Sequence, residues 1–182
     1  MVFTFLILLP GILAAQDFGA KTQASPLVDP ATASDTVEVI VRLDHEQAAP
    51  GTEVLAGVSF SIPKHWHIFW KNPNTTVRAL PPSFKWTLPE GITAGEILWP
   101  KHTQLNLFGE MANVYEHQVM LLTELSVGKN VKFGEHKIGL KVDWQQCTDR
   151  TCVPKKKEFQ LTLKVGADAK LSENPEEFTV WL

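Results

Sequence analysis

Four stretches of the chain alternate apolar and polar side chains with a period of two residues. This alternation is typical of β-strands that pack one face on a core and leave the other face in water. No stretch of helical length repeats its apolar residues with the 3.6-residue period of an amphipathic helix. The alternating stretches span residues 37–43, 54–62, 138–144 and 159–165. The chain is therefore restricted to a fold built mainly from half-buried strands.

Prolines divide the remaining apolar residues into shorter strand candidates. Proline has no N–H to donate to a β-ladder, so it marks the ends of strands. The shorter candidates span residues 65–70, 84–88, 94–99 and 114–122. About seven to nine short strands separated by turn residues are typical of a two-layer β-sandwich. We therefore predict an all-β fold, an antiparallel β-sandwich, for residues 35–166.

The first residues of the chain have the composition of a signal peptide for export. Residues 2–13 are almost entirely apolar, and Ala14 and Ala15 provide the small side chains of a cleavage site. The apolar run is shorter than the roughly 20 residues that a membrane-spanning helix needs. We expect residues 1–15 to direct export, with a buried N-terminal strand or helix as the alternative.

The segments on either side of the predicted domain lack a core pattern. Residues 16–34 are rich in Ala, Ser, Thr and Gln and contain two prolines, which is the composition of a flexible linker. Residues 167–182 contain Asp, Ser, Asn, Pro and Glu-Glu and are expected to form a C-terminal tail. The formal net charge of −3 gives no electrostatic indication of a nucleic-acid partner.

The two cysteines, Cys147 and Cys152, lie between two alternating stretches with four residues between them. A hairpin turn of this length brings two Cα atoms within the roughly 4.4–6.8 Å that a disulfide requires. Outside the cytoplasm such a pair usually forms a disulfide. The ring that it closes contributes only about 2 kcal/mol to stability, while its place in a loop favours access by another protein. On spacing alone, a structural bond and an exchanging pair both remain open.

Other polar residues give weaker indications. His65 and His67 flank Trp66 and are expected on one face of a strand, packed or facing solvent, because no third metal ligand is evident nearby. Two sulfurs without further ligands do not make a zinc site. The three lysines at residues 155–157 are typical of a solvated strand edge. We expect no metal site, no cofactor and no small-molecule substrate.

Four groups of residues occur together in an order and spacing that match a known family. They are residues 63–73 (PKHWHIFWKNP), residues 81–100 from PPSFKW to ILWP, residues 107–116 from LFG to NVYE, and Trp144 followed by Cys147, Cys152, Val153 and Pro154. Over roughly residues 36–165 the chain resembles the N-terminal periplasmic domain of the thiol:disulfide interchange protein DsbD family and its relatives in copper-tolerance systems. The resemblance implies an immunoglobulin-like fold for the sandwich and a periplasmic location.

The resemblance also implies a function. Domains of this family accept electrons from a membrane-embedded thiol reductase domain and pass them to periplasmic thioredoxin-like proteins, including factors of cytochrome c maturation. The chain would then be a protein-disulfide reductase domain that acts by thiol–disulfide exchange. The alternative is an immunoglobulin-like binding module with a purely structural disulfide.

Finally, the resemblance assigns roles to individual residues. Cys147 and Cys152 match the redox pair of the family, and by position Cys152 forms the mixed disulfide with the downstream partner while Cys147 resolves it. In the family a cap loop covers the disulfide. Here the matching residues are Phe108, as the aromatic cap, and Gly109, as its hinge. The alternative for Phe108 is an ordinary core side chain.

Overall fold

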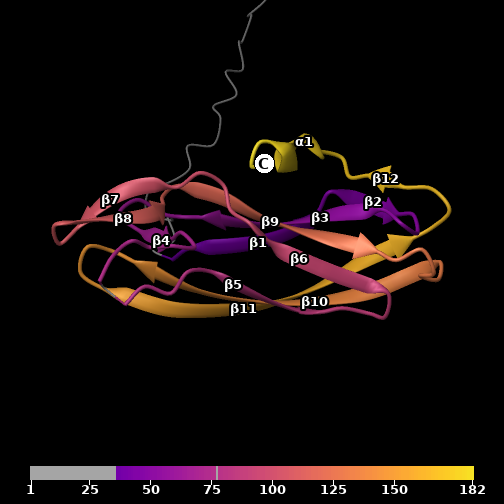
Figure 1. Ribbon diagram of the computed structural model, residues 1–182, viewed down its shortest axis with the longest axis horizontal. Helices are drawn as coiled ribbons and strands as arrows, with labels where there is room; N and C mark the ends of the chain where they lie inside the picture. The colour runs from indigo at the N-terminus through magenta and orange to yellow at the C-terminus, as the bar shows by residue number, and fades with distance from the viewer. Residues whose placement is uncertain (1–35, 77) are drawn as a thin grey trace, which may run out of the picture. The chain divides into compact units, whose positions relative to one another are not determined.

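The computed structural model describes residues 36–76 and 78–182 and builds them almost entirely from β-strands (Figure 1). The predicted signal peptide and the predicted linker both fall on residues 1–35, outside the described residues. The all-β prediction is confirmed. The elements are β1 (Glu38–Leu43), β2 (His45–Ala48), β3 (Glu53–Ser61), β4 (His67–Phe69), β5 (Ser83–Thr87), β6 (Ile92–Leu98), β7 (Thr103–Leu107), β8 (Glu110–Tyr115), β9 (Gln118–Val127), β10 (Gly134–Cys147), β11 (Cys152–Val165), β12 (Lys170–Leu171) and α1 (Glu176–Thr179).

Two sheets form the layers of the fold. One sheet has the strand order β1-β3-β9-β6, and the other has the order β12-β2-β11-β10-β4-β8-β7, with β5 also paired to β10. Most pairs are antiparallel, whereas β2 runs parallel to β11, with Gln47 opposite Lys164. The longest hairpin joins β10 to β11, whose register runs from Gly134 opposite Val165 to Cys147 opposite Cys152. β10 ends at Cys147 and β11 begins at Cys152, so the two cysteines form the last pair of this register, next to the turn.

Alternate side chains of the strands fill the space between the two sheets. The largest buried cluster includes Phe60 on β3, Leu121 on β9 and Val142 and Trp144 on β10. Because successive side chains of a strand point to opposite faces, Cys147 lies on the other face of β10 from Trp144. The disulfide is therefore not part of the core between the sheets.

The structure corrects one predicted strand. The stretch 114–122 was expected to be continuous, but β8 ends at Tyr115 in one sheet and β9 begins at Gln118 in the other. Between them His117 has a φ of 64°, in the left-handed region that ends a strand. Apolar residues on both sides of this crossing hide it from a periodicity argument.

The C-terminal residues 167–182, expected to form a tail, contain β12 and the short helix α1. Phe178 on α1 is buried and packs on Met120 and Leu122 of β9. A Cβ added at Gly57 of β3 would lie 2.9 Å from the Phe178 ring, so this glycine leaves the space that the ring occupies. The segment therefore covers the outer face of the β1-β3-β9-β6 sheet. Among the residues that the structure describes, no helix has the length and apolar character needed to cross a membrane.

Candidate redox site

The β10–β11 hairpin ends in a disulfide between directly opposite residues. Cys147 faces Cys152 in the register, their Cα atoms are 4.1 Å apart, and their sulfurs are bonded. The backbone N–H of Thr148 donates to the carbonyl of Thr151 at 2.8 Å and closes the turn. The hydroxyl of Thr148 accepts hydrogen bonds from the backbone N–H groups of Arg150 and Thr151, each at 3.2 Å. The structure thus joins the two cysteines that the sequence predicted to be close.

The two cysteines differ in their access to solvent. Cys147 is fully buried, with 0% exposure, whereas Cys152 is only partly buried. Thiol–disulfide exchange requires an attacking thiolate to reach one sulfur of the bond. Cys152 is therefore the member of the pair that an external thiol reaches more readily.

A small apolar cluster surrounds Cys147 on the outer face of its sheet. Its buried members are Phe69 on β4, Leu107 on β7, and Ala112 and Val114 on β8. Ala79, Leu105 and Cys152 pack against this group. Apolar surroundings disfavour the charged form of a thiol, so the cluster opposes a thiolate at Cys147 in the reduced protein.

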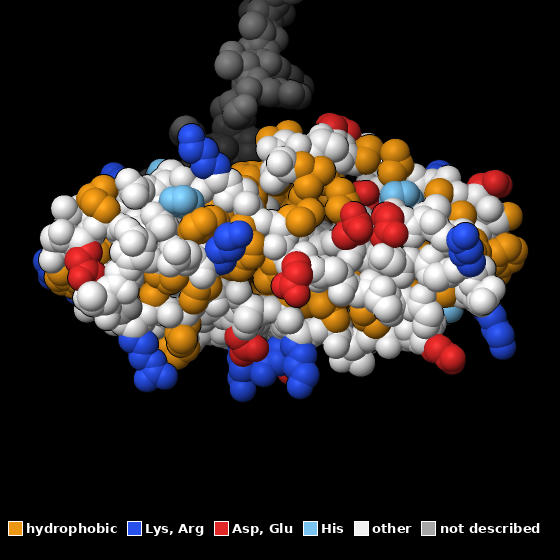
Figure 2. All heavy atoms as spheres, viewed as in Figure 1, with side chains coloured by type: hydrophobic (Ala, Val, Ile, Leu, Met, Phe, Trp, Pro, Cys, Tyr) orange, Lys and Arg blue, Asp and Glu red, His pale blue; other side chains and the backbone are white. Residues whose placement is uncertain are grey.

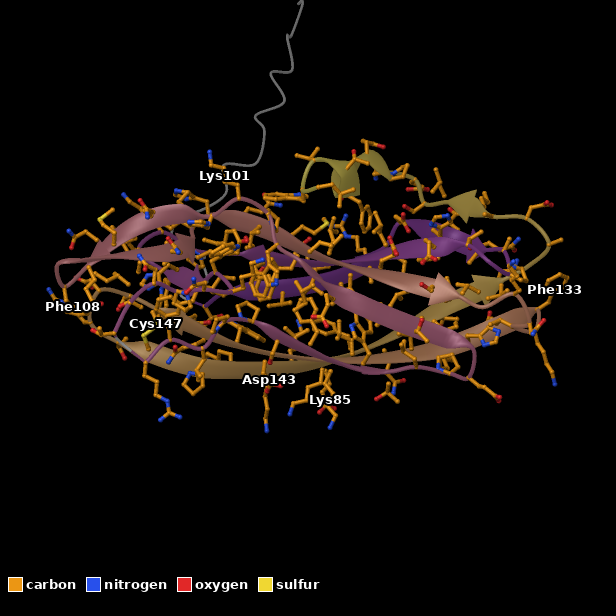
Figure 3. All side chains as sticks on the ribbon, in the orientation of Figure 1. Lys85, Lys101, Phe108, Phe133, Asp143 and Cys147 are labelled. Atoms are coloured by element: carbon orange, nitrogen blue, oxygen red, sulfur yellow. A yellow bond between two sulfur atoms is a disulfide. The ribbon has the colours of Figure 1, made fainter. Side chains whose placement is uncertain are left out.

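The predicted cap residues form the turn between β7 and β8. Phe108 and Gly109 have φ values of 55° and 91°, the pattern of a type I′ hairpin turn, and the side-chain oxygen of Asn106 accepts a hydrogen bond from Gly109 N–H at 3.0 Å. Phe108 is 79% exposed at the hairpin tip, and Figure 3 shows Cys147 further in at the same end of the sheets. The alternative of a core side chain for Phe108 is therefore wrong, and its role as a cap stays a prediction. The buried residues that this hairpin contributes to the cluster around Cys147 are Leu107, Ala112 and Val114, none of which the sequence argument singled out.

His67 lies directly across the sheet from Cys147. The two residues are partners in the antiparallel register of β4 and β10. Opposite residues of this kind have their side chains on the same face, with Cβ atoms about 4.5–5.5 Å apart. His67 is 2% exposed, and its Nε2 has no hydrogen-bond partner among the described residues. Burial lowers the pKa of His67 to about 4, so the imidazole is neutral at neutral pH.

The expectation that His65 and His67 share one face of a strand is wrong. His65 precedes β4, has a φ of 70° and is exposed, so the two imidazoles do not share a strand face. Among the described residues, no three His, Cys, Asp or Glu side chains come together as a possible metal site.

The segment between β4 and β5 makes hydrogen bonds to two strands near the disulfide, β8 and β10. Glu110 at the start of β8 accepts hydrogen bonds from the hydroxyl of Thr75 at 2.6 Å and from the backbone and hydroxyl of Thr76 at 2.7 and 2.6 Å. These bonds lower the pKa of the Glu110 carboxyl. Further along, the backbone N–H of Leu80 donates to the side chain of Gln145 on β10 at 3.0 Å. The segment is therefore fixed at both ends beside the cluster around Cys147.

The lysines after the second cysteine alternate between the two faces of β11. Figure 2 shows Lys and Arg side chains along the lower edge of the view, where Figure 3 labels Lys85 and Asp143. Lys156 lies opposite Asp143 in the register, and Lys157 donates to the backbone carbonyl of Val39 at 3.0 Å. These two lysines thus lie beside a carboxylate and a backbone oxygen.

Fold and site together define a class: a β-sandwich domain with a cross-strand disulfide at a hairpin turn, one cysteine buried and the other partly exposed. A family profile described as the N-terminal domain of the thiol:disulfide interchange protein DsbD matches residues 41–164. The chain belongs to this family. The predicted immunoglobulin-like antiparallel sandwich is confirmed with it.

One solved structure supports the fold, and a second is similar with a lower TM-score. The N-terminal periplasmic domain of ScsB from Proteus mirabilis is 15% identical with a TM-score of 0.55, and the match covers 84% of this chain and 54% of that chain. The chain thus spans about half the length of that structure. The reduced N-terminal domain of DsbD from Neisseria meningitidis is 17% identical with a TM-score of 0.43, and the match covers 74% of this chain and 90% of that chain. A search of curated proteins gave no significant match.

Proposed function

We propose that the chain is a periplasmic thiol–disulfide exchange domain that uses Cys147 and Cys152 to relay electrons between proteins. The observation that carries this proposal is the disulfide itself, which joins a buried cysteine to a partly exposed one at the end of a hairpin. Membership of the DsbD N-terminal domain family supports the same chemistry. The electron donor we propose is a membrane-embedded thiol reductase domain, and the acceptors are thioredoxin-like proteins, including those of cytochrome c maturation.

The burial of the two cysteines supports different roles for them. In the reduced domain, the thiolate of Cys152 attacks a partner's disulfide, a bond forms between the two sulfurs, and the partner's second sulfur leaves as a thiolate. Cys147 then attacks the sulfur of Cys152, which restores the internal disulfide and releases the partner as a dithiol. Two electrons pass from the domain to the partner in this sequence. The same steps in reverse reload the domain from its donor.

The proposed location follows from the export signal expected in residues 1–15 and from the relatives. The solved domain from Proteus mirabilis is described as periplasmic. An oxidising compartment also suits a chain whose two cysteines form a disulfide.

A second candidate function is a binding module with a purely structural disulfide. The complete burial of Cys147 favours it, because a buried sulfur is protected from stray thiols. The two functions differ in the redox behaviour of the bond. Structural disulfides of secreted proteins have reduction potentials below about −300 mV, whereas exchanging disulfides have higher potentials.

The test is to equilibrate the folded domain with glutathione redox buffers and to count free thiols by alkylation and mass spectrometry. We expect the wild-type disulfide to equilibrate while the circular dichroism spectrum is unchanged. With oxidised glutathione, Cys147→Ala is expected to form a mixed disulfide through Cys152 at least about tenfold faster than Cys152→Ala forms one through Cys147. If the disulfide of the folded domain resists reduction, the binding module with a structural disulfide is the correct function. If Cys152→Ala forms its mixed disulfide faster, Cys147 is the attacking cysteine and Cys152 the resolving one.

A further inference from the structure

Packing alone does not explain a histidine at position 67. Its imidazole is 2% exposed, and Nε2 lacks a partner in the part of the chain that the structure describes. A buried polar atom without a hydrogen bond costs free energy that an apolar ring of the same size would not. Phe69, two residues along the same strand and 1% exposed, shows that this face accommodates such a ring.

What lies opposite the imidazole changes with the redox state. In the disulfide the sulfur of Cys147 carries no proton, so it has nothing to donate to a neighbouring nitrogen. Reduction gives Cys147 an S–H group, and the thiol must lose that proton before it can attack. Because His67 and Cys147 are register partners on one face of the sheet, the unpartnered nitrogen belongs to the residue directly across from this thiol.

The other titratable groups on the surrounding elements are occupied or exposed. They include Glu110 and Tyr115 on β8, Asp143 on β10, which lies 3.5 Å from Nζ of Lys141, Asp149 and Arg150 in the β10–β11 turn, His65 before β4 and Arg78 before β5. The Tyr115 hydroxyl donates to a backbone carbonyl at 2.7 Å, and the carboxylate of Glu110 accepts its hydrogen bonds from the segment before β5. Asp149 and Arg150 are exposed and lie 3.8 Å from each other. None of these groups pairs with Nε2 of His67 among the described residues.

We propose that His67 is the acid–base partner of Cys147: in the reduced domain Nε2 accepts a hydrogen bond from the Cys147 thiol, and it takes the proton when Cys147 attacks. The inference rests on the proposed exchange function of the Cys147–Cys152 pair.

The step balances within the mixed disulfide. Nε2 takes the proton of Cys147, the thiolate attacks the sulfur of Cys152, and the internal disulfide forms as the bond from Cys152 to the partner breaks. The partner's sulfur leaves with the electron pair of that bond and is protonated by the imidazolium, directly or through water. When a donor thiol attacks Cys152 instead, its proton passes through water to Nε2, Cys147 leaves with the electron pair of the broken bond, and the imidazolium returns the proton to Cys147.

The electrostatics of the pair are consistent with this role. Burial holds the pKa of His67 at about 4 in the oxidised protein. A thiolate nearby favours the charged imidazolium, and an imidazolium favours the thiolate. The imidazolium that forms when Nε2 takes the proton therefore favours the Cys147 thiolate at the moment of attack.

The test follows the reaction of the reduced chain with Ellman's disulfide, which releases two coloured thiolates in sequence. The first release reports attack by Cys152, and the second reports resolution by Cys147. We expect His67→Gln and His67→Phe to slow the second release at pH 7 by about tenfold or more and to move its pH profile to higher pH, with the first release unchanged. The matched control is Ile68→Val, which alters packing on the same strand but on the face toward the core between the sheets, and keeps the wild-type pH profile.

Each outcome has a separate meaning. Wild-type pH profiles in both His67 variants overturn the inference and leave the exchange function standing, because the wild type still releases both thiolates. A wild type without a second release overturns the exchange function and the inference with it. If the variants fail to fold, the 15N chemical shift of His67 Nε2 in the wild-type chain decides. Equal shifts in the oxidised and reduced proteins overturn the inference, and a change in the reduced protein toward the shift of a hydrogen-bonded imidazole nitrogen supports it.

Discussion

Leu107 and Phe108 are neighbours in one hairpin, but their environments are opposite. Leu107 is 7% exposed in the cluster around Cys147, and Phe108 is 79% exposed at the tip. An apolar side chain over a disulfide slows attack by small thiols because it must first move aside. In this structure the neighbour of the predicted cap, Leu107, and not Phe108, belongs to the cluster around Cys147, so we expect Leu107 to shield the disulfide.

Substitution of these two residues separates their roles. We expect Leu107→Ala to speed reduction of the disulfide by dithiothreitol severalfold and to lower the free energy of unfolding by about 2–5 kcal/mol, as for other buried leucines. Phe108→Ala is expected to change stability by less than about 0.5 kcal/mol and the reduction rate less than Leu107→Ala does. Stopped-flow reduction and urea unfolding measure both effects. A larger rate increase for Phe108→Ala would show that its ring closes over the sulfurs in solution.

At the residue scale, the sequence was informative where the interaction is local. Cys147 and Cys152 are joined by a short turn, so their spacing alone brought them together. His67 reaches Cys147 only through the pairing of β4 with β10, which are far apart in the chain. Strand register over such a distance is set by the whole sheet, so no local pattern around His67 revealed its partner.

At the scale of elements, Glu110 fastens the segment before β5 to β8 by its three hydrogen bonds. These bonds lower the pKa of its carboxyl below the ordinary value of 4.5, so the folded state binds this proton more weakly than the unfolded state does. The stabilising effect is therefore complete above the ordinary value and is lost as pH falls through the lowered pKa.

We expect hydrogen exchange at the Thr76 amide, corrected for its intrinsic rate, to increase as pH falls below about 4.5. Glu110→Gln should raise it at pH 7, because the variant loses the charge that these donors face. Glu116→Gln is the control, and mass spectrometry of the segment is the measurement. Exchange that is equal in both variants would mean that Glu110 does not hold the segment.

The helix α1 lies outside the residues matched by the family profile, which end at 164, yet its Phe178 is buried on β9. We expect Phe178→Ala to lower the free energy of unfolding by about 3–5 kcal/mol without changing the rate of disulfide reduction. The control is Val180→Ala, whose side chain is 77% exposed and whose effect should stay below about 0.5 kcal/mol. An equally small loss for Phe178→Ala would mean that the segment does not stay on the sheet in solution.

The strands that the sequence predicted well are those with one face buried in the core between the sheets. On β10, alternation from Ile138 to Trp144 reports burial directly, because each apolar residue faces the core between the sheets. The hairpin of β7 and β8 gave no such pattern, since its apolar side chains pack on a small cluster outside that core. The crossing at His117 was missed because apolar residues lie close on both sides of Glu116, His117 and Gln118, and the two sides belong to different sheets. Alternation therefore identified strands but not the sheet to which each belongs.

At the scale of the whole molecule, the relay that we propose requires the domain to stay folded in both redox states. The disulfide closes only the four-residue turn at the end of the long β10–β11 register, and the remaining pairs from Gly134 opposite Val165 onward do not depend on it. Constraint of so short a ring contributes about 2 kcal/mol in the chain-entropy account. Such a loss is small beside the stability of a typical domain.

We therefore expect the reduced domain to unfold in one cooperative transition, with a free energy of unfolding about 2 kcal/mol below that of the oxidised domain and a Tm lower by roughly 4–8 °C. Calorimetry with and without reductant measures this difference, and the Cys147→Ala, Cys152→Ala double variant, tested with and without reductant, controls for effects of the reductant itself. The reason is that the core between the two sheets contains neither cysteine, so its packing survives reduction. If reduction abolished the cooperative transition, the disulfide would be a staple for the sandwich, and a domain that must give up this bond in every cycle could not carry electrons.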